Sequence, residues 1–137
     1  MSTTRAELNR QLQNINRDIS TTNTQISTLR GQVSEINTAQ AELSVIINVA
    51  AEDRQRLNLL DCEDPNYWNG HYQGKCSTGY NECIQNMASY TDRLDRWMED
   101  LNAAQLRFEN DLTAQVSALA RLNNSHQSIT NQLANMR

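Results

Sequence analysis

Residues 8–36 read LNRQLQNINRDISTTNTQISTLRGQVSEI, and their apolar side chains recur in alternating steps of four and three. The same spacing continues to Leu57, with Thr22, Gln40 and Arg54 as its polar interruptions. An apolar stripe with this repeat is the pattern of an amphipathic helix that packs against another helix. Its members are Leu8, Leu12, Ile15, Ile19, Ile26, Leu29, Val33, Ile36, Leu43, Ile47, Ala50 and Leu57. We therefore predict a first helix over about residues 4–60.

The second half of the chain carries a matching stripe, whose members are Tyr80, Ile84, Met87, Leu94, Met98, Leu101, Phe108, Leu112, Leu119, Leu122, Ile129, Leu133 and Met136. Its polar interruptions are Thr91, Gln105, Gln115 and His126. Polar residues in such a stripe specify register or oligomeric state more often than they bind a ligand. Because neither helix can bury its stripe alone, we predict that a second helix, over about residues 79–135, folds back on the first as an antiparallel hairpin.

The segment between the two stripes contains the only proline and three of the four glycines. The proline disfavours helical geometry in the residue before it, and Asn69-Gly70 offers a turn. We expect a loop over residues 61–78, with Ser77 or Thr78 capping the second helix. The predicted fold is all-α, a single helical-hairpin domain over residues 1–137.

Composition and charge narrow the class of function. Aromatic residues make up 5% of the chain, and a two-helix hairpin has a thin core without an enclosed pocket, so we expect a non-enzymatic protein without a cofactor. The net charge is -4 and the basic residues are scattered, so neither nucleic-acid binding nor direct membrane insertion is expected. No stretch resembles a secretory signal peptide or a membrane span, so the expected location is the cytoplasm, before any export by another route.

The cysteines and one histidine form the only cluster with metal-ligand chemistry. Cys62, His71, Cys76 and Cys83 are spaced more widely than the paired ligands that zinc prefers, so no metal site is predicted. A disulfide between Cys62 and Cys76 is favoured over zinc if the chain reaches an oxidising compartment. We expect Cys83, beside Ile84 of the stripe, to be buried.

A further set of apolar residues lies outside the main stripe. Its members are Val45, Ile46, Val49, Trp97, Ala104 and Val116. A two-helix hairpin covers only one stripe internally, so additional apolar positions indicate contact with helices of a partner, which would complete a four-helix bundle. The alternative is a slightly wide core stripe within the hairpin.

The loop contains Trp68-Asn69-Gly70, a W-x-G sequence between two long helical stripes. This arrangement resembles the WXG superfamily of type VII secretion proteins, and within it the small YwqH-like helical proteins encoded beside LXG toxins. The resemblance covers nearly the whole chain. It lies in the Asn/Gln/Ser-rich opening with I-x-x-L and L-x-x-I steps, the segment from Ala39 to Leu43, the W-x-G turn and the long second helix.

The resemblance implies a targeting factor. Such a protein would pair with the helical N-terminal domain of an LXG-type toxin, together with a second small helical protein in some assemblies, and would help to present the toxin to the type VII secretion machinery. The chain departs from the family's Y-x-x-x-D/E export element, because Tyr90 is followed at that spacing by Leu94. Phe108, followed by Leu112, fails the related F-x-x-x-D pattern. The alternative function is a homo-oligomeric coiled-coil scaffold that forms homodimers.

Overall fold

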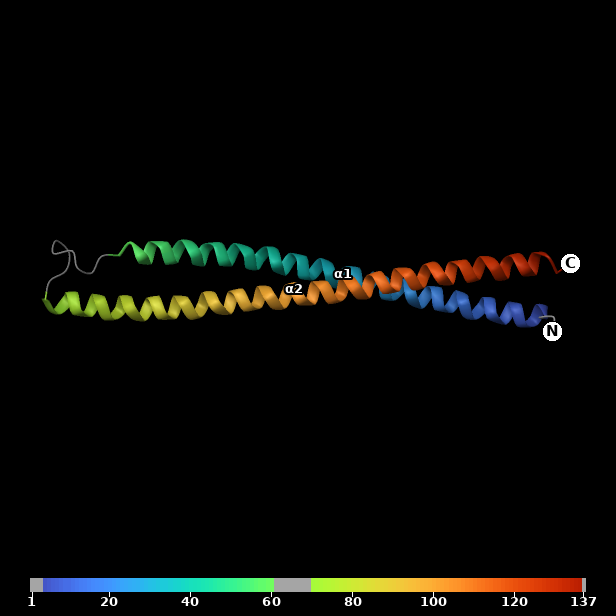
Figure 1. The fold of residues 1–137 in the computed structure, drawn as a ribbon, viewed down its shortest axis with the longest axis horizontal. Helices are drawn as coiled ribbons and strands as arrows, with labels where there is room; N and C mark the ends of the chain where they lie inside the picture. The colour runs from blue at the N-terminus through green and yellow to red at the C-terminus, as the bar shows by residue number, and fades with distance from the viewer. Residues whose placement is uncertain (1–3, 61–69, 137) are drawn as a thin grey trace. The chain divides into compact units, whose positions relative to one another are not determined.

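The computed structural model describes residues 4–60 and 70–136, apart from the side chains of His71 and Gln73. It contains two helices, α1 (Arg5–Asn58) and α2 (Gly70–Ala134). The two helices pack against each other as an antiparallel hairpin (Figure 1), which confirms the predicted all-α fold. Neither described helix contains a stretch apolar enough to cross a membrane.

The start of α1 is fixed by a capping residue. The backbone N–H of Glu7 donates to the Thr4 hydroxyl oxygen at 3.1 Å, and the N–H of Leu8 donates to the Thr4 carbonyl oxygen at 3.1 Å. The Thr4 hydroxyl thus satisfies one of the backbone donors that the first turn of a helix leaves without a partner. Glu7 also places a negative charge in the first turn, where the helix dipole favours it.

The start of α2 corrects the predicted boundary of about residue 79. The helix begins at Gly70, which has a φ of 46°, and Gly74 and Gly79 lie inside it. The Thr78 hydroxyl does not cap the helix, because it donates to the Gly74 carbonyl oxygen, one turn earlier, at 3.0 Å. Each interior glycine costs about 1 kcal/mol relative to alanine but does not by itself end a helix. The predicted loop over 61–78 was therefore too long at its C-terminal end.

The chain divides into two compact units, each built from parts of both helices. Unit 1 comprises Met1–Ile36 and Ala104–Arg137, and unit 2 comprises Asn37–Ala103. The prediction of a single domain over residues 1–137 stays a prediction.

Unit 2 holds a hydrophobic core formed by the predicted stripes. Leu43, Ala50 and Leu94 are buried, and the Leu94 side chain is only 1% exposed. The partly buried side chains that pack against this core are Ile47, Met98 and Leu101. All six belong to the heptad positions expected from the sequence, so burial in unit 2 follows the seven-residue repeat.

Two of the three polar interruptions of the stripes in unit 2, Gln40 and Thr91, form side-chain hydrogen bonds. Gln40 donates from its amide nitrogen to the Asn102 side-chain oxygen across the hairpin, at 2.8 Å. The Thr91 hydroxyl lies 3.0 Å from the carbonyl oxygens of both Met87 and Ala88 in its own helix. The bond between Gln40 and Asn102 links the two helices at one defined register, which agrees with the role expected for Gln40.

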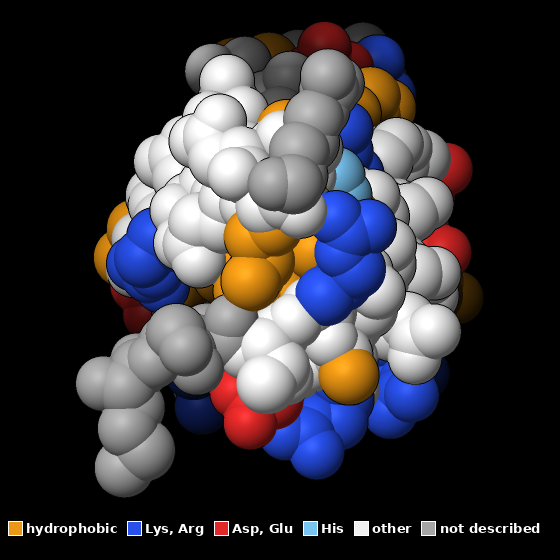
Figure 2. All heavy atoms as spheres, turned by 90° about the vertical axis from the view of Figure 1, so that its right-hand side faces the viewer, with side chains coloured by type: hydrophobic (Ala, Val, Ile, Leu, Met, Phe, Trp, Pro, Cys, Tyr) orange, Lys and Arg blue, Asp and Glu red, His pale blue; other side chains and the backbone are white. Residues whose placement is uncertain are grey.

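In unit 1 the buried side chains are spread along the stripes. Leu8, Ile26 and Ile129 are buried together with one polar residue, Thr22. The Arg5 guanidinium donates to the Met136 carbonyl oxygen at 2.6 Å and so joins the start of α1 to the end of α2. At the end of the unit that holds both termini, hydrophobic side chains form small separate areas among polar and basic ones (Figure 2).

Candidate protein-interaction surface

Four of the six predicted interface residues lie in unit 2 with exposed side chains. The exposed fractions are 62% for Val45, 44% for Ile46, 50% for Val49 and 55% for Trp97. Each of these residues lies within three positions of a buried core residue on the same helix, yet none belongs to the buried stripe. Exposure of this kind leaves apolar surface that the hairpin itself does not cover.

Ile46 and Trp97 line one groove, although they come from different helices. The groove has a volume of about 480 Å³, and we call it the Trp97 groove. Its lining residues are Ala39, Glu42, Leu43, Ile46, Trp97, Asp100 and Leu101. Leu43 is buried and Leu101 is half-buried, so these two form the floor of the groove, while the exposed Ile46 and Trp97 form its walls.

A second groove in unit 2 involves residues that the sequence analysis did not single out. We call it the Tyr90 groove, and its volume is about 560 Å³. Its lining residues are Asp53, Arg56, Leu57, Leu60, Cys83, Asn86, Met87 and Tyr90. Leu60 and Tyr90 are both exposed large hydrophobic residues, so this groove also carries apolar surface that the hairpin leaves uncovered.

Both grooves lie along the same flank of the hairpin, as the heptad spacing makes plain. On α1, Ile46 of the Trp97 groove and Leu60 of the Tyr90 groove are two heptads apart. On α2, Tyr90 and Trp97 are one heptad apart. Ile46, Tyr90 and Trp97 immediately precede a stripe residue and so occupy g positions, and Leu60, two heptads after Ile46, occupies the same position; g positions are usually charged in a coiled coil. We call the surface that carries Ile46, Leu60, Tyr90 and Trp97 the Trp97 face.

Tyr90 and Leu60 could have been found from the sequence by their heptad spacing from residues that were already singled out. Counting one heptad back from Trp97 reaches Tyr90, and counting two heptads forward from Ile46 reaches Leu60. The pairing of Ile46 with Trp97 across the hairpin needed the register between the helices, which no spacing within a single helix provides.

The Trp97 groove is flanked by carboxylates. Glu42 and Asp100 are exposed members of its lining, and that lining contains no basic residue. Among the described residues, the one ion pair joins the Arg56 guanidinium to the Asp53 carboxylate at 3.7 Å. The charges of Glu42 and Asp100 are therefore not compensated by an ion pair within the described part of the chain.

The remaining two predicted interface residues, Ala104 and Val116, lie in unit 1 and do not share one flank. Ala104 precedes the stripe residue Gln105, whereas Val116 follows the stripe residue Gln115. Positions before and after the stripe project to opposite sides of it. Ala104 is also half-buried, whereas Val116 is 44% exposed. The expectation that all six residues contact one partner stays a prediction.

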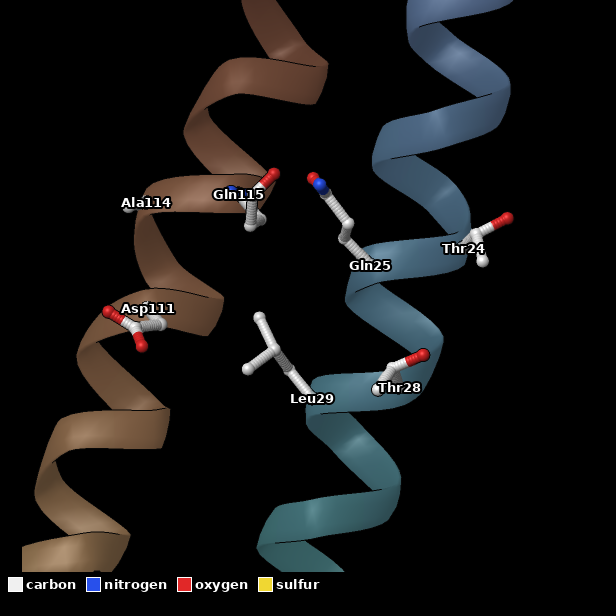
Figure 3. Close-up of a pocket in the computed structure, with 7 residues that line it drawn as sticks. All are labelled: Thr24, Gln25, Thr28, Leu29, Asp111, Ala114 and Gln115. Atoms are coloured by element: carbon white, nitrogen blue, oxygen red, sulfur yellow. The ribbon is translucent and has the colours of Figure 1, made fainter.

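Unit 1 has a groove of a different chemistry, with a volume of about 360 Å³. Gln25 of α1 and Gln115 of α2 extend toward each other across it, and Leu29 points from α1 toward α2 (Figure 3). Thr24 and Thr28 point away from α2 in the same view. Four of the seven residues that line this groove are uncharged and polar, namely Thr24, Gln25, Thr28 and Gln115.

The cysteines differ from one another in their state. Cys76 is disulfide-bonded, while Cys83 is a free and exposed cysteine that lines the Tyr90 groove. The expected burial of Cys83 was wrong, because its g position lies at the edge of the stripe and not within it. Cys62 lies outside the described residues, so its predicted disulfide with Cys76 stays a prediction.

The W-x-G sequence is described only at its end. Gly70 is the first residue of α2, while Trp68 and Asn69 lie outside the described residues. In the described part of the chain, no three His, Cys, Asp or Glu residues are grouped so that they could hold a metal ion. Comparison of the chain with protein-family models, with curated proteins and with solved structures gives no match.

Proposed function

We propose that this protein is a non-enzymatic adaptor that binds a helical protein partner through the Trp97 face. The observation that carries the proposal is the Trp97 groove, where an exposed tryptophan and an exposed isoleucine from different helices border an apolar floor. Tryptophan is enriched among the residues that contribute most to binding at protein interfaces. A groove on a helix pair accepts the apolar side of another helix.

The resemblance to the WXG superfamily supports a specific partner and role. On that resemblance, the partner is the helical N-terminal domain of an LXG-type toxin, and the adaptor promotes export of the toxin by a type VII secretion system. The two-helix hairpin agrees with the resemblance at the level of fold. The W-x-G sequence and the Asn/Gln/Ser-rich opening of the chain support the rest of the proposal.

Co-expression with the protein encoded next to this chain tests the proposal. Size-exclusion chromatography with light scattering would give the mass of any complex, and we expect a stable heteromer. The chain alone has a mass of 15.6 kDa, so a heteromer is readily distinguished from a free monomer. A homodimer that does not bind the neighbouring protein would instead favour the coiled-coil scaffold.

Trp97→Asp tests whether the Trp97 face is the surface used. The substitution places a charge in the apolar groove, so we expect the free energy of binding to the partner to weaken by at least about 2 kcal/mol, as for an interface hot spot. Helicity measured by circular dichroism should change little, since the side chain is 55% exposed.

Leu106→Asp is the matched control for Trp97→Asp. Leu106 is an exposed apolar residue of α2, 61% exposed, and it lines neither groove of the Trp97 face. We expect this variant to bind the partner like the unmodified chain. If both variants weakened partner binding equally, or if Trp97→Asp lost helicity, the assignment of the binding surface to the Trp97 face would be wrong.

A further inference from the structure

We infer that the Trp97 face binds an amphipathic partner helix whose apolar residues are flanked by lysine or arginine. The inference rests on the proposed function and specifies the chemistry of the partner at the same surface. Two independent features carry it, namely the apolar g positions and the carboxylates beside them.

The apolar feature fits one helix laid along the hairpin. The Trp97 and Tyr90 grooves follow each other along one flank of unit 2, with their exposed side chains repeating at heptad intervals. A straight partner helix presents apolar side chains at the same interval, so successive turns can enter successive grooves. Val49, exposed on α1 between Ile46 and Asp53, adds apolar surface between the two grooves.

The electrostatic feature selects the partner's charge. Glu42 comes from α1 and Asp100 from α2, and both line the Trp97 groove without a basic residue in that lining. Unit 2 as a whole contains 11 acidic and 5 basic residues, whereas the rest of the chain contains 5 acidic and 7 basic. Lysine or arginine beside the partner's apolar residues would therefore meet complementary charge, which increases both specificity and the rate of association.

The exposed indole favours the same partner. A lysine or arginine side chain that reaches past the groove wall can stack on the face of Trp97 while its charged end approaches a carboxylate. An acidic helix would gain neither interaction and would be repelled by Glu42 and Asp100.

The same charges argue against a second copy of this chain as the occupant of the face. A symmetric homodimer through the Trp97 face would place the same patch on both sides of the interface. The groove linings of that face carry three carboxylates, Glu42, Asp53 and Asp100, and one basic residue, Arg56, so two copies would meet with the same net negative charge. Like charges brought together in this way oppose association.

Two synthetic helical peptides test the inference on the full chain. Both have about four heptads and the same leucine stripe, but one has lysine and the other glutamate at the flanking positions. Fluorescence anisotropy of the labelled peptides gives their affinities. We expect the lysine peptide to bind at least about 10-fold more tightly than the glutamate peptide, and the difference to shrink as salt rises.

The variant Glu42→Lys/Asp100→Lys should remove or reverse this preference. Its matched control is Glu52→Lys/Glu99→Lys, which makes the same change in net charge on the same two helices but alters no residue that lines either groove. The control should retain most of the preference, which separates the groove from general attraction between a basic peptide and an acidic protein.

The inference is overturned if the two peptides bind with equal affinity, if neither binds, or if both double variants change the preference equally. The co-expression experiment reports on the proposed function separately. A heteromer with the neighbouring protein, combined with equal peptide affinities, would leave the adaptor function in place and remove only the basic partner helix.

Discussion

Gly31 makes α1 less stable than an alanine at the same position would. It lies in the interior of α1, and a Cβ atom added there would meet no heavy atom within 4 Å. Glycine in a helix interior costs about 1 kcal/mol relative to alanine, chiefly because it loses more backbone freedom on folding. We therefore predict that Gly31→Ala stabilises the protein by about 0.5 to 1 kcal/mol, measured by urea unfolding followed at 222 nm.

Gly70→Ala is the informative contrast for this prediction. A Cβ atom at Gly70 also meets nothing within 4 Å, but the φ of Gly70 is 46°, a conformation that residues with a side chain rarely adopt. Alanine there should cost about 1 kcal/mol. A gain in stability from both substitutions would show that open space, and not backbone conformation, decides the effect.

At the scale of the element, the start of α1 depends on one hydroxyl. The Thr4 hydroxyl accepts a hydrogen bond from the Glu7 N–H in the first turn of this helix, at 3.1 Å. Replacing a capping threonine by alanine typically costs about 1 kcal/mol. We predict that Thr4→Ala speeds hydrogen exchange at the amides of Glu7 and Leu8 by roughly 5-fold, with little change in the middle of α1, because helix ends open locally.

Thr4→Ser keeps a hydroxyl that can accept the same bond and is the control for Thr4→Ala. We expect it to exchange like the unmodified protein. If Thr4→Ser and Thr4→Ala gave the same exchange rates at Glu7 and Leu8, the cap would have no part in fixing the start of α1.

The two helices differ in how well their boundaries could be predicted from the sequence. The ends of α1 were expected within two residues, because its heptad stripe spans nearly the whole helix. The start of α2 was placed about nine residues too late, because Gly74 and Gly79 were interpreted as part of a turn. Both glycines instead lie within a long helix, whose backbone hydrogen bonds continue through them even though glycine is a poor helix former.

The candidate surface could be predicted from the sequence only in part, because the groove depends on both helices. Ile46 and Trp97 are exposed because they lie outside the stripe, and the spacing of residues within each helix is enough to predict this. Their meeting in one groove depends on the register between α1 and α2, and Gln40 with Asn102 helps to define that register. Because register is a property of the helix pair, the sequence of each helix taken alone leaves it open.

At the scale of the whole molecule, the chemistry of the two units differs. The grooves of the Trp97 face belong to unit 2, whereas the groove between Gln25 and Gln115 belongs to unit 1. The hydrophobic core cluster also belongs to unit 2, around Leu94. Within the described residues, therefore, the unit with the clustered core also carries the exposed apolar grooves, and its packing supports the candidate interface directly.

The stability of each unit should respond mainly to its own core, because a residue in a helical hairpin contacts only neighbouring layers of the stripe. Leu94→Ala removes the most buried side chain of unit 2 and should cost about 2 to 5 kcal/mol there. We predict that hydrogen exchange followed by mass spectrometry shows at least about 10-fold lower protection in unit 2, while peptides around Leu8 and Ile26 of unit 1 keep theirs. Ile129→Ala, which truncates a buried residue of unit 1, should give the reverse pattern. Equal loss of protection in both units from either substitution would instead mean that the hairpin opens as one cooperative structure.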